Sequence, residues 1–87
     1  MEFTLDGRCM TDRAAAHAHL QAQLHLPDYY GRNLDALYDV LTERAEPLTI
    51  RISNPEQIEE NLGRYGASML LVFRQAEENN PNLTVEI

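Results

Sequence analysis

Three short stretches of the chain alternate apolar with polar residues, which is the pattern of a β-strand with one buried face. They cover residues 2–6, which stop at the turn dipeptide Asp6-Gly7, then residues 48–52, which are rich in β-branched side chains, and finally residues 83–87. The alternation predicts three strands, each with one side directed toward a core.

The first two segments between these strands show helical signals. Residues 13–24 are rich in alanine and carry apolar side chains at helical spacing, and Pro27 stops the pattern. A second helix is predicted to begin at Asn33, a residue type that caps helices, and to run to about residue 44. A loop from Asp28 to Arg32 leads to this second helix.

Two further helices are predicted before the last strand. Pro55 fits the first position of a short helix that ends at Gly63, with Ser53 or Asn54 as its cap. Residues 66–79 form the other, and because residues 69–73 are all apolar we expect this helix to be buried between other layers.

Strands that are separated by helices require crossover connections and therefore a parallel sheet. We predict an α/β fold: a small three-stranded parallel sheet covered by about four helices. The 87 residues contain no repeat, low-complexity tract or linker, so residues 1–87 are expected to form a single domain.

The composition restricts the classes of partner. The formal charge is −7, from 14 acidic residues against 7 arginines and no lysine, which disfavours nucleic acid and membranes as direct partners. A basic protein is the more natural target, although the charge could equally serve only to keep a small domain in solution.

Cys9 is the single cysteine and no Cys/His cluster has zinc spacing, so we expect no disulfide, metal or cofactor. With no visible signal peptide and no run of about 18 apolar residues, a cytoplasmic location is expected.

One face of the second predicted helix carries the main functional clue. Steps of about 100° per residue place its aliphatic side chains on one side and group four others on another side; these are Asp35, Tyr38, Asp39 and Thr42. Asp35 and Asp39 stand four residues apart, where like charges repel by about 0.2–0.5 kcal/mol. The first helical turn favours an acid at Asp35 but not at Asp39. A merely solvated surface remains the alternative.

The loop before this helix strengthens the binding interpretation. Tyr29 and Tyr30 adjoin Gly31, and amphipathic rings in a loop are typical interface anchors. The pattern leaves open which ring points outward and which packs inward. Gly31 is explained either by a positive φ angle or by the close approach of another backbone.

The segment from Leu26 to Thr42, read as LPDYYGRNLDALYDVLT, closely resembles the signature of the barstar family of ribonuclease inhibitors. The resemblance extends to the order of elements, to Gly66-Ala67 and to Val72-Phe73-Arg74. It implies a protein that fills the active-site groove of a basic, barnase-like ribonuclease as a heterodimer. Separately, the acidic stripe is free of large aliphatic side chains, which predicts a monomer when the protein is unbound.

The same resemblance assigns roles to individual residues. Asp39 is expected to occupy the place of a substrate phosphate and to accept forked hydrogen bonds from arginines of the enzyme. Asp35 is expected to bind donors at the rim of the site, Tyr29 to lie against the catalytic histidine, and Gly31 to allow close backbone approach. The full predicted binding set is Tyr29, Tyr30, Gly31, Asn33, Asp35, Tyr38, Asp39, Thr42, Arg44 and Gln75.

Four positions depart from the family pattern. Tyr38 replaces a common tryptophan, Arg44 stands where an aromatic residue is frequent, and Gln75 stands where the last helix often has a glutamate. Arg32 adds a positive charge beside the acidic stripe. These departures predict a related enzyme with an altered rim.

The sequence also allows two other functions. Paired carboxylates can act in acid–base catalysis or hold a metal, but His17, His19 and His25 belong to the first helix and its end, and Cys9 has no activating neighbour. We therefore expect no enzymatic activity. The stronger alternative is an immunity protein of the same fold that neutralises a different toxin or binds another basic protein.

Overall fold

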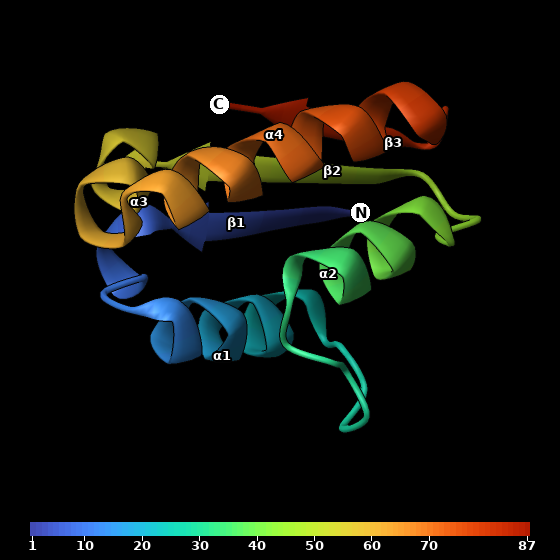
Figure 1. The fold of residues 1–87 in the computed structure, drawn as a ribbon. Helices are drawn as coiled ribbons and strands as arrows, with labels where there is room; N and C mark the ends of the chain where they lie inside the picture. The colour runs from blue at the N-terminus through green and yellow to red at the C-terminus, as the bar shows by residue number, and fades with distance from the viewer.

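The computed structural model describes all of residues 1–87, and its elements follow the predicted order (Figure 1). They are β1 (Glu2–Asp6), the 3-10 helix η1 (Gly7–Cys9), α1 (Arg13–Leu24), α2 (Leu34–Thr42), β2 (Leu48–Ser53), α3 (Pro55–Leu62), α4 (Arg64–Asn79) and β3 (Leu83–Glu86). The strands form one parallel sheet in the order β1-β2-β3. The predicted fold class, a three-stranded parallel sheet with four α-helices, is confirmed.

The alternating pattern of the strands separates a covered face of the sheet from an open one. The apolar residues of the three strands face the helices, and all except the half-buried Phe3 are buried, among them Leu5 and Ile50. The intervening residues are polar, and on β2 Arg51 pairs with Glu2 at 3.0 Å and with Glu86 at 2.7 Å. The helices therefore cover one face, and cross-strand polar pairs occupy the other.

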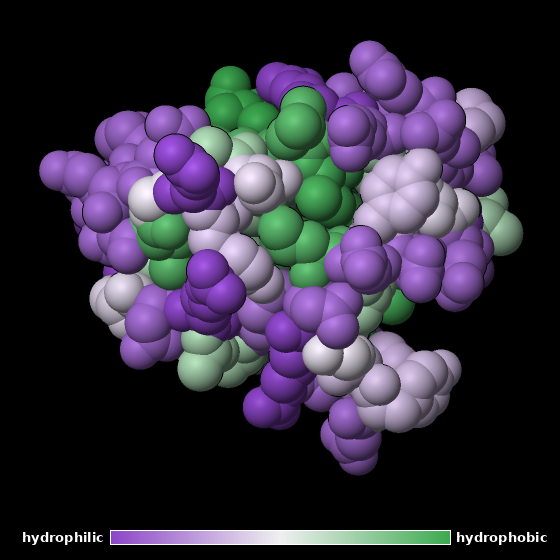
Figure 2. All heavy atoms as spheres, in the orientation of Figure 1, coloured by the Kyte–Doolittle hydropathy of each residue, from purple (hydrophilic) through white to green (hydrophobic).

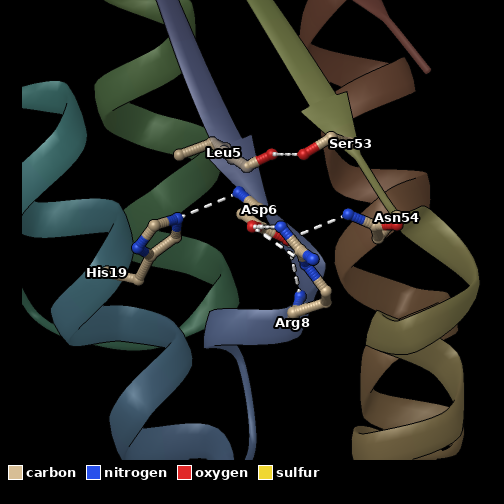
Figure 3. A network of polar contacts seen from close by, with 6 residues as sticks. All are labelled: Leu5, Asp6, Arg8, His19, Ser53 and Asn54. Atoms are coloured by element: carbon tan, nitrogen blue, oxygen red, sulfur yellow. Dashed lines mark hydrogen bonds and ion pairs between the residues drawn. The ribbon is translucent and has the colours of Figure 1, made fainter.

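Side chains satisfy the outer edges of the sheet, where unpaired backbone groups would invite another strand. At the β3 edge, the Val85 N–H donates to Glu77 Oε2 at 2.6 Å, and Arg74 Nη1 donates to the Val85 carbonyl at 3.1 Å. At the β1 edge, the Asp6 N–H donates to His19 Nε2 at 3.0 Å (Figure 3). His19 is thus a structural acceptor at this edge.

The turn after β1 is fixed by the carboxylate of Asp6, which Figure 3 shows between β1 and the end of β2. It accepts hydrogen bonds from the Arg8 guanidinium at 2.9 Å and from Asn54 Nδ2 at 3.1 Å. Of the two predicted cap residues, Asn54 occupies the N-cap position of α3, with a left-handed φ of 53° before Pro55, but its side chain donates to Asp6 and makes no cap hydrogen bond.

The fourth helix differs from its prediction in its surroundings. Only one of its faces is buried, through Met69, Phe73 and Ala76, while Leu71 is 56% exposed. The expectation of burial on all sides was wrong because α4 belongs to the single helical layer and has no element outside it. Figure 2 shows the resulting hydrophobic area over α4.

Candidate partner-binding surface

Helix α2 presents the predicted acidic face to solvent. Its cap is Asn33, whose Oδ1 accepts from the Ala36 N–H at 2.7 Å, and Leu37 and Leu41 are buried beneath it. Asp35 and Asp39 are exposed, and none of the ion pairs in the structure involves either carboxylate. The two acids are therefore free to meet a cation from outside.

Two other members of the stripe make contacts within the fold. The Thr42 hydroxyl donates to the Tyr38 carbonyl at 2.8 Å, and the Tyr38 hydroxyl accepts from Asn79 Nδ2 on α4 at 2.8 Å. Both residues are half-buried. The Tyr38 hydroxyl helps to fix α2 against α4, whereas the Thr42 hydroxyl bonds within α2, and only the remaining surface of the two residues is open to a partner.

The two tyrosines of the loop take opposite orientations. Tyr29 is 89% exposed, whereas Tyr30 is only 6% exposed and its hydroxyl lies 2.8 Å from His17 Nδ1. Tyr29 is thus the outward ring that the sequence could not identify. Tyr30, included in the predicted binding set, packs inside the fold and can act there only by positioning the loop.

His17 connects the loop to two helices. Its Nε2 lies 2.6 Å from the hydroxyl of Tyr65, at the start of α4. Burial and the positive charge of Arg32 lower the pKa of His17, and burial raises the pKa of the Tyr30 hydroxyl and that of Tyr65. A neutral imidazole therefore bridges the tyrosines, with one nitrogen donating and the other accepting.

The backbone turn beside Gly31 is made by its neighbour. Arg32 has the left-handed φ of 53°, and Gly31 does not have a positive φ, so the positive-φ explanation for this glycine was wrong. A Cβ on Gly31 would lie 3.1 Å from Ala36 Cβ, and the residue is exposed. The fold itself therefore leaves little room for a side chain at Gly31, and the close approach of another backbone stays a prediction.

Gln21 on α1 holds both ends of the loop. Its Nε2 donates to the Pro27 carbonyl at 3.0 Å, and its Oε1 accepts from Arg32 Nη2 at 3.0 Å. Arg44, in turn, ties the end of α2 to α1 by donating to the Leu24 carbonyl at 2.9 Å. These contacts fix the loop before any partner arrives, which lowers the entropy lost on binding.

Sequence reasoning missed Gln21, Tyr65 and the bridging role of His17. One signal was present, because His17 and Gln21 stand four residues apart and so share a helix face. Tyr65 gave no signal, since its partner is 48 residues away in the chain.

A groove lies beside the acidic face, next to Tyr29. Its volume is about 360 Å³, and its lining is His25, Leu26, Pro27, Tyr29, Val40, Glu43 and Arg44. Gln75 is exposed on α4, which packs beside α2. The predicted residues other than Tyr30 are exposed or half-buried, and they lie on the loop, on α2 or just after it, and on α4.

The surface has no arrangement for holding a metal, because no three His, Cys, Asp or Glu side chains cluster suitably. None of the helices has the length and apolar character needed to cross a bilayer. What the surface offers is exposed carboxylates, an exposed aromatic ring and a groove, a combination suited to binding another macromolecule.

Comparison with known proteins identifies the family of the chain. The family model described as "Barstar (barnase inhibitor)" matches residues 1–87. A Bacillus subtilis (strain 168) protein, YrdF, whose name describes it as a candidate ribonuclease inhibitor, is 43% identical over 78 residues, covering 88% of this chain and 86% of the relative.

Proposed function

This chain belongs to the barstar family, a family of barnase inhibitors and not of enzymes, and from that premise we propose that it blocks a barnase-like ribonuclease with the acidic surface of α2 and its preceding loop. In this proposal Asp39 occupies the place of an RNA phosphate. The observation that carries it is that Asp35 and Asp39 are exposed and unpaired on a helix fixed from below.

The chemistry of the target supports the proposal. A ribonuclease site holds a polyanion and is therefore basic, so a chain of charge −7 is attracted to it at long range. At contact, a carboxylate can accept two parallel N–H···O bonds from one guanidinium. Inhibition then requires only exclusion of RNA, with no chemical step.

The loop supplies the rigid part of the surface. Tyr29 is held outward because Tyr30, the next residue, is anchored in the core by His17. An exposed ring on a fixed backbone is a low-entropy anchor, and the groove beside it can receive a side chain of the enzyme. Asp39 and Tyr29 would thus act as neighbouring anchors.

The test is titration of the protein into barnase and related ribonucleases with a fluorogenic RNA substrate. We expect near-stoichiometric inhibition of a cognate enzyme and an association rate that falls as salt rises. Asp39→Asn keeps the shape and removes the charge. Because a hydrogen bond to a charged group contributes about 1.5–3 kcal/mol, loss of a forked pair should weaken inhibition about 100-fold or more.

Glu59→Gln is the matched control, since it removes one exposed acid from α3 and leaves α2 unchanged. It should change inhibition by no more than a few-fold, through net charge alone. Equal inhibition by wild type and Asp39→Asn would reject Asp39 as the anchor. Binding to another basic protein without inhibition of any ribonuclease would favour the immunity-protein alternative.

A further inference from the structure

A second hollow borders the proposed contact surface on the side of α1. Its volume is about 380 Å³, and it is lined by Arg13, Ala14, His17, Arg32, Asn33 and Tyr65. Asn33 belongs both to this lining and to the predicted contact set, so the hollow adjoins the surface that would face the ribonuclease. It is separate from the groove beside Tyr29, with which it shares no residue.

The hollow holds two arginines without carboxylate partners. The four ion pairs of the structure use Arg8, Arg51 and Arg74, but neither Arg13 nor Arg32. Arg13 lies over the Tyr65 ring at 4.1 Å, and Arg32 makes one hydrogen bond, to a neutral amide oxygen. The chain has two acidic residues for every arginine and is negatively charged overall, whereas the lining of this hollow carries two positive charges without acidic partners.

Neighbouring side chains leave these donors available. Asp12, the nearest acid in sequence to Arg13, caps α1 by accepting from the Ala15 N–H at 2.7 Å. The Tyr65 hydroxyl is directed to His17. Each guanidinium has five N–H groups, so most of the donors on Arg13 and Arg32 are free for an anion.

The backbone of Arg32, at the edge of the hollow, has a left-handed conformation. Its left-handed conformation costs about 1–2 kcal/mol for a residue with a side chain, although glycine adopts it freely. Strain of this kind concentrates at functional positions. Here it accompanies a side chain that reaches α1 through Gln21, at the edge of the hollow.

We propose that this pocket receives an aspartate or glutamate side chain from the rim of the ribonuclease. The proposal rests on the proposed function and extends it to specificity. Two guanidiniums can grip a carboxylate in the forked geometry, and the occupant is a protein side chain because the surface around Asn33 would be covered by the enzyme. A ribonuclease with a basic residue at that position would be rejected by like-charge repulsion.

The decisive variant is Arg32→Glu, because the two possible outcomes have opposite signs. If Arg32 faces an acid of the enzyme, the dissociation constant should rise about tenfold or more. If it faces only the basic cleft, the added carboxylate should strengthen inhibition. Arg64→Glu is the control, since it makes the same charge change on an exposed arginine outside the hollow.

Rescue identifies the partner group. Each acidic rim residue of the inhibited ribonuclease is changed to lysine, and one such change should restore inhibition by Arg32→Glu while weakening inhibition by the wild-type chain. Inhibition by Arg32→Glu that equals or exceeds that of the wild type would overturn the pocket assignment and leave the proposed function standing.

Anion binding to the pocket can also be measured directly on the isolated protein. This test does not depend on inhibition of a ribonuclease, so it still applies if the proposed function fails. Acetate and inorganic phosphate are titrated into the isolated protein while NMR follows the guanidinium N–H signals. Saturable shifts with acetate, abolished in Arg13→Gln/Arg32→Gln, would support a carboxylate pocket. The absence of a response to acetate, or a response to phosphate alone, would refute it.

Discussion

His17 couples the stability of the protein to pH, because its ring is buried and neutral between two tyrosine hydroxyls. Burial first, and then the charge of Arg32, lowers its pKa below the ordinary value of 6.5. The unfolded chain takes up a proton on this ring as the pH falls through about 6.5, whereas the folded chain resists. The free energy of unfolding is therefore greatest above pH 6.5 and decreases as the pH is lowered.

The pH dependence that His17 adds to the free energy of unfolding is limited, because the ring takes up only one proton. Its slope cannot exceed about 1.4 kcal/mol per pH unit, and it continues down to the pKa of the folded state. His17→Gln keeps a neutral donor and acceptor but cannot titrate. Above pH 7 this variant should be about 1–3 kcal/mol less stable than the wild type, because the buried Tyr30 hydroxyl loses a well-placed partner. The difference should shrink as the pH falls.

Urea unfolding followed by far-UV circular dichroism between pH 5.5 and about pH 8 measures the difference, since the chain has no tryptophan to report by fluorescence. His25→Gln, which removes an exposed imidazole that is not part of this network, is the comparison variant. The Arg8 hydrogen bonds lower the pKa of Asp6 below its ordinary 3.8, so their contribution to stability is complete throughout this range and is lost only at lower pH. Parallel curves for wild type and His17→Gln would refute the linkage.

Two packing predictions concern the support of α2 and α4. Gly66→Ala should lower the free energy of unfolding by about 2–3 kcal/mol, because the new Cβ would lie 2.3 Å from the Ile58 carbonyl oxygen. Urea unfolding measures the change. A free energy of unfolding within about 0.5 kcal/mol of the wild type would contradict this close contact between α3 and α4. Asn80→Ala should lower the free energy of unfolding by about 1–3 kcal/mol, because Asn80 Nδ2 donates to the carbonyls of Leu41 and Arg44. Amide-exchange protection should fall more in α2 than in the sheet. Unchanged protection in α2 would contradict this role of Asn80.

The fold could be predicted because its signals are local. Each strand buries one face, so alternation reports the sheet directly, and α1 buries Ala16, His17, Leu20 and Leu24 at the expected spacing. The surroundings of α4 could not be predicted in this way. An apolar run at residues 69–73 does not reveal that one side of the helical layer has no cover.

In the candidate site, too, helix periodicity predicted some orientations, whereas others depend on tertiary contacts. The exposure of Asp35 and Asp39 followed from the periodicity of α2, which also placed Leu37 and Leu41 inside. The opposite orientations of Tyr29 and Tyr30 depend on a partner 13 residues away, His17, and adjacent residues in a loop carry no periodic signal. Tertiary contact, invisible in the local pattern, decided which ring is available.

The distribution of charge partners distinguishes acids that fold the chain from acids that are left for binding. Asp6, Asp12 and Glu77 each accept backbone or side-chain hydrogen bonds that hold a turn, a helix start or a sheet edge. Asp35 and Asp39 have no ion-pair partner, and their spacing costs about 0.2–0.5 kcal/mol in repulsion. That cost is far below the several kcal/mol that a forked contact with an enzyme arginine can return. A small stability penalty at this helix face is thus compatible with strong binding, and affinity measurements, more than stability measurements, will reveal what the acidic pair does.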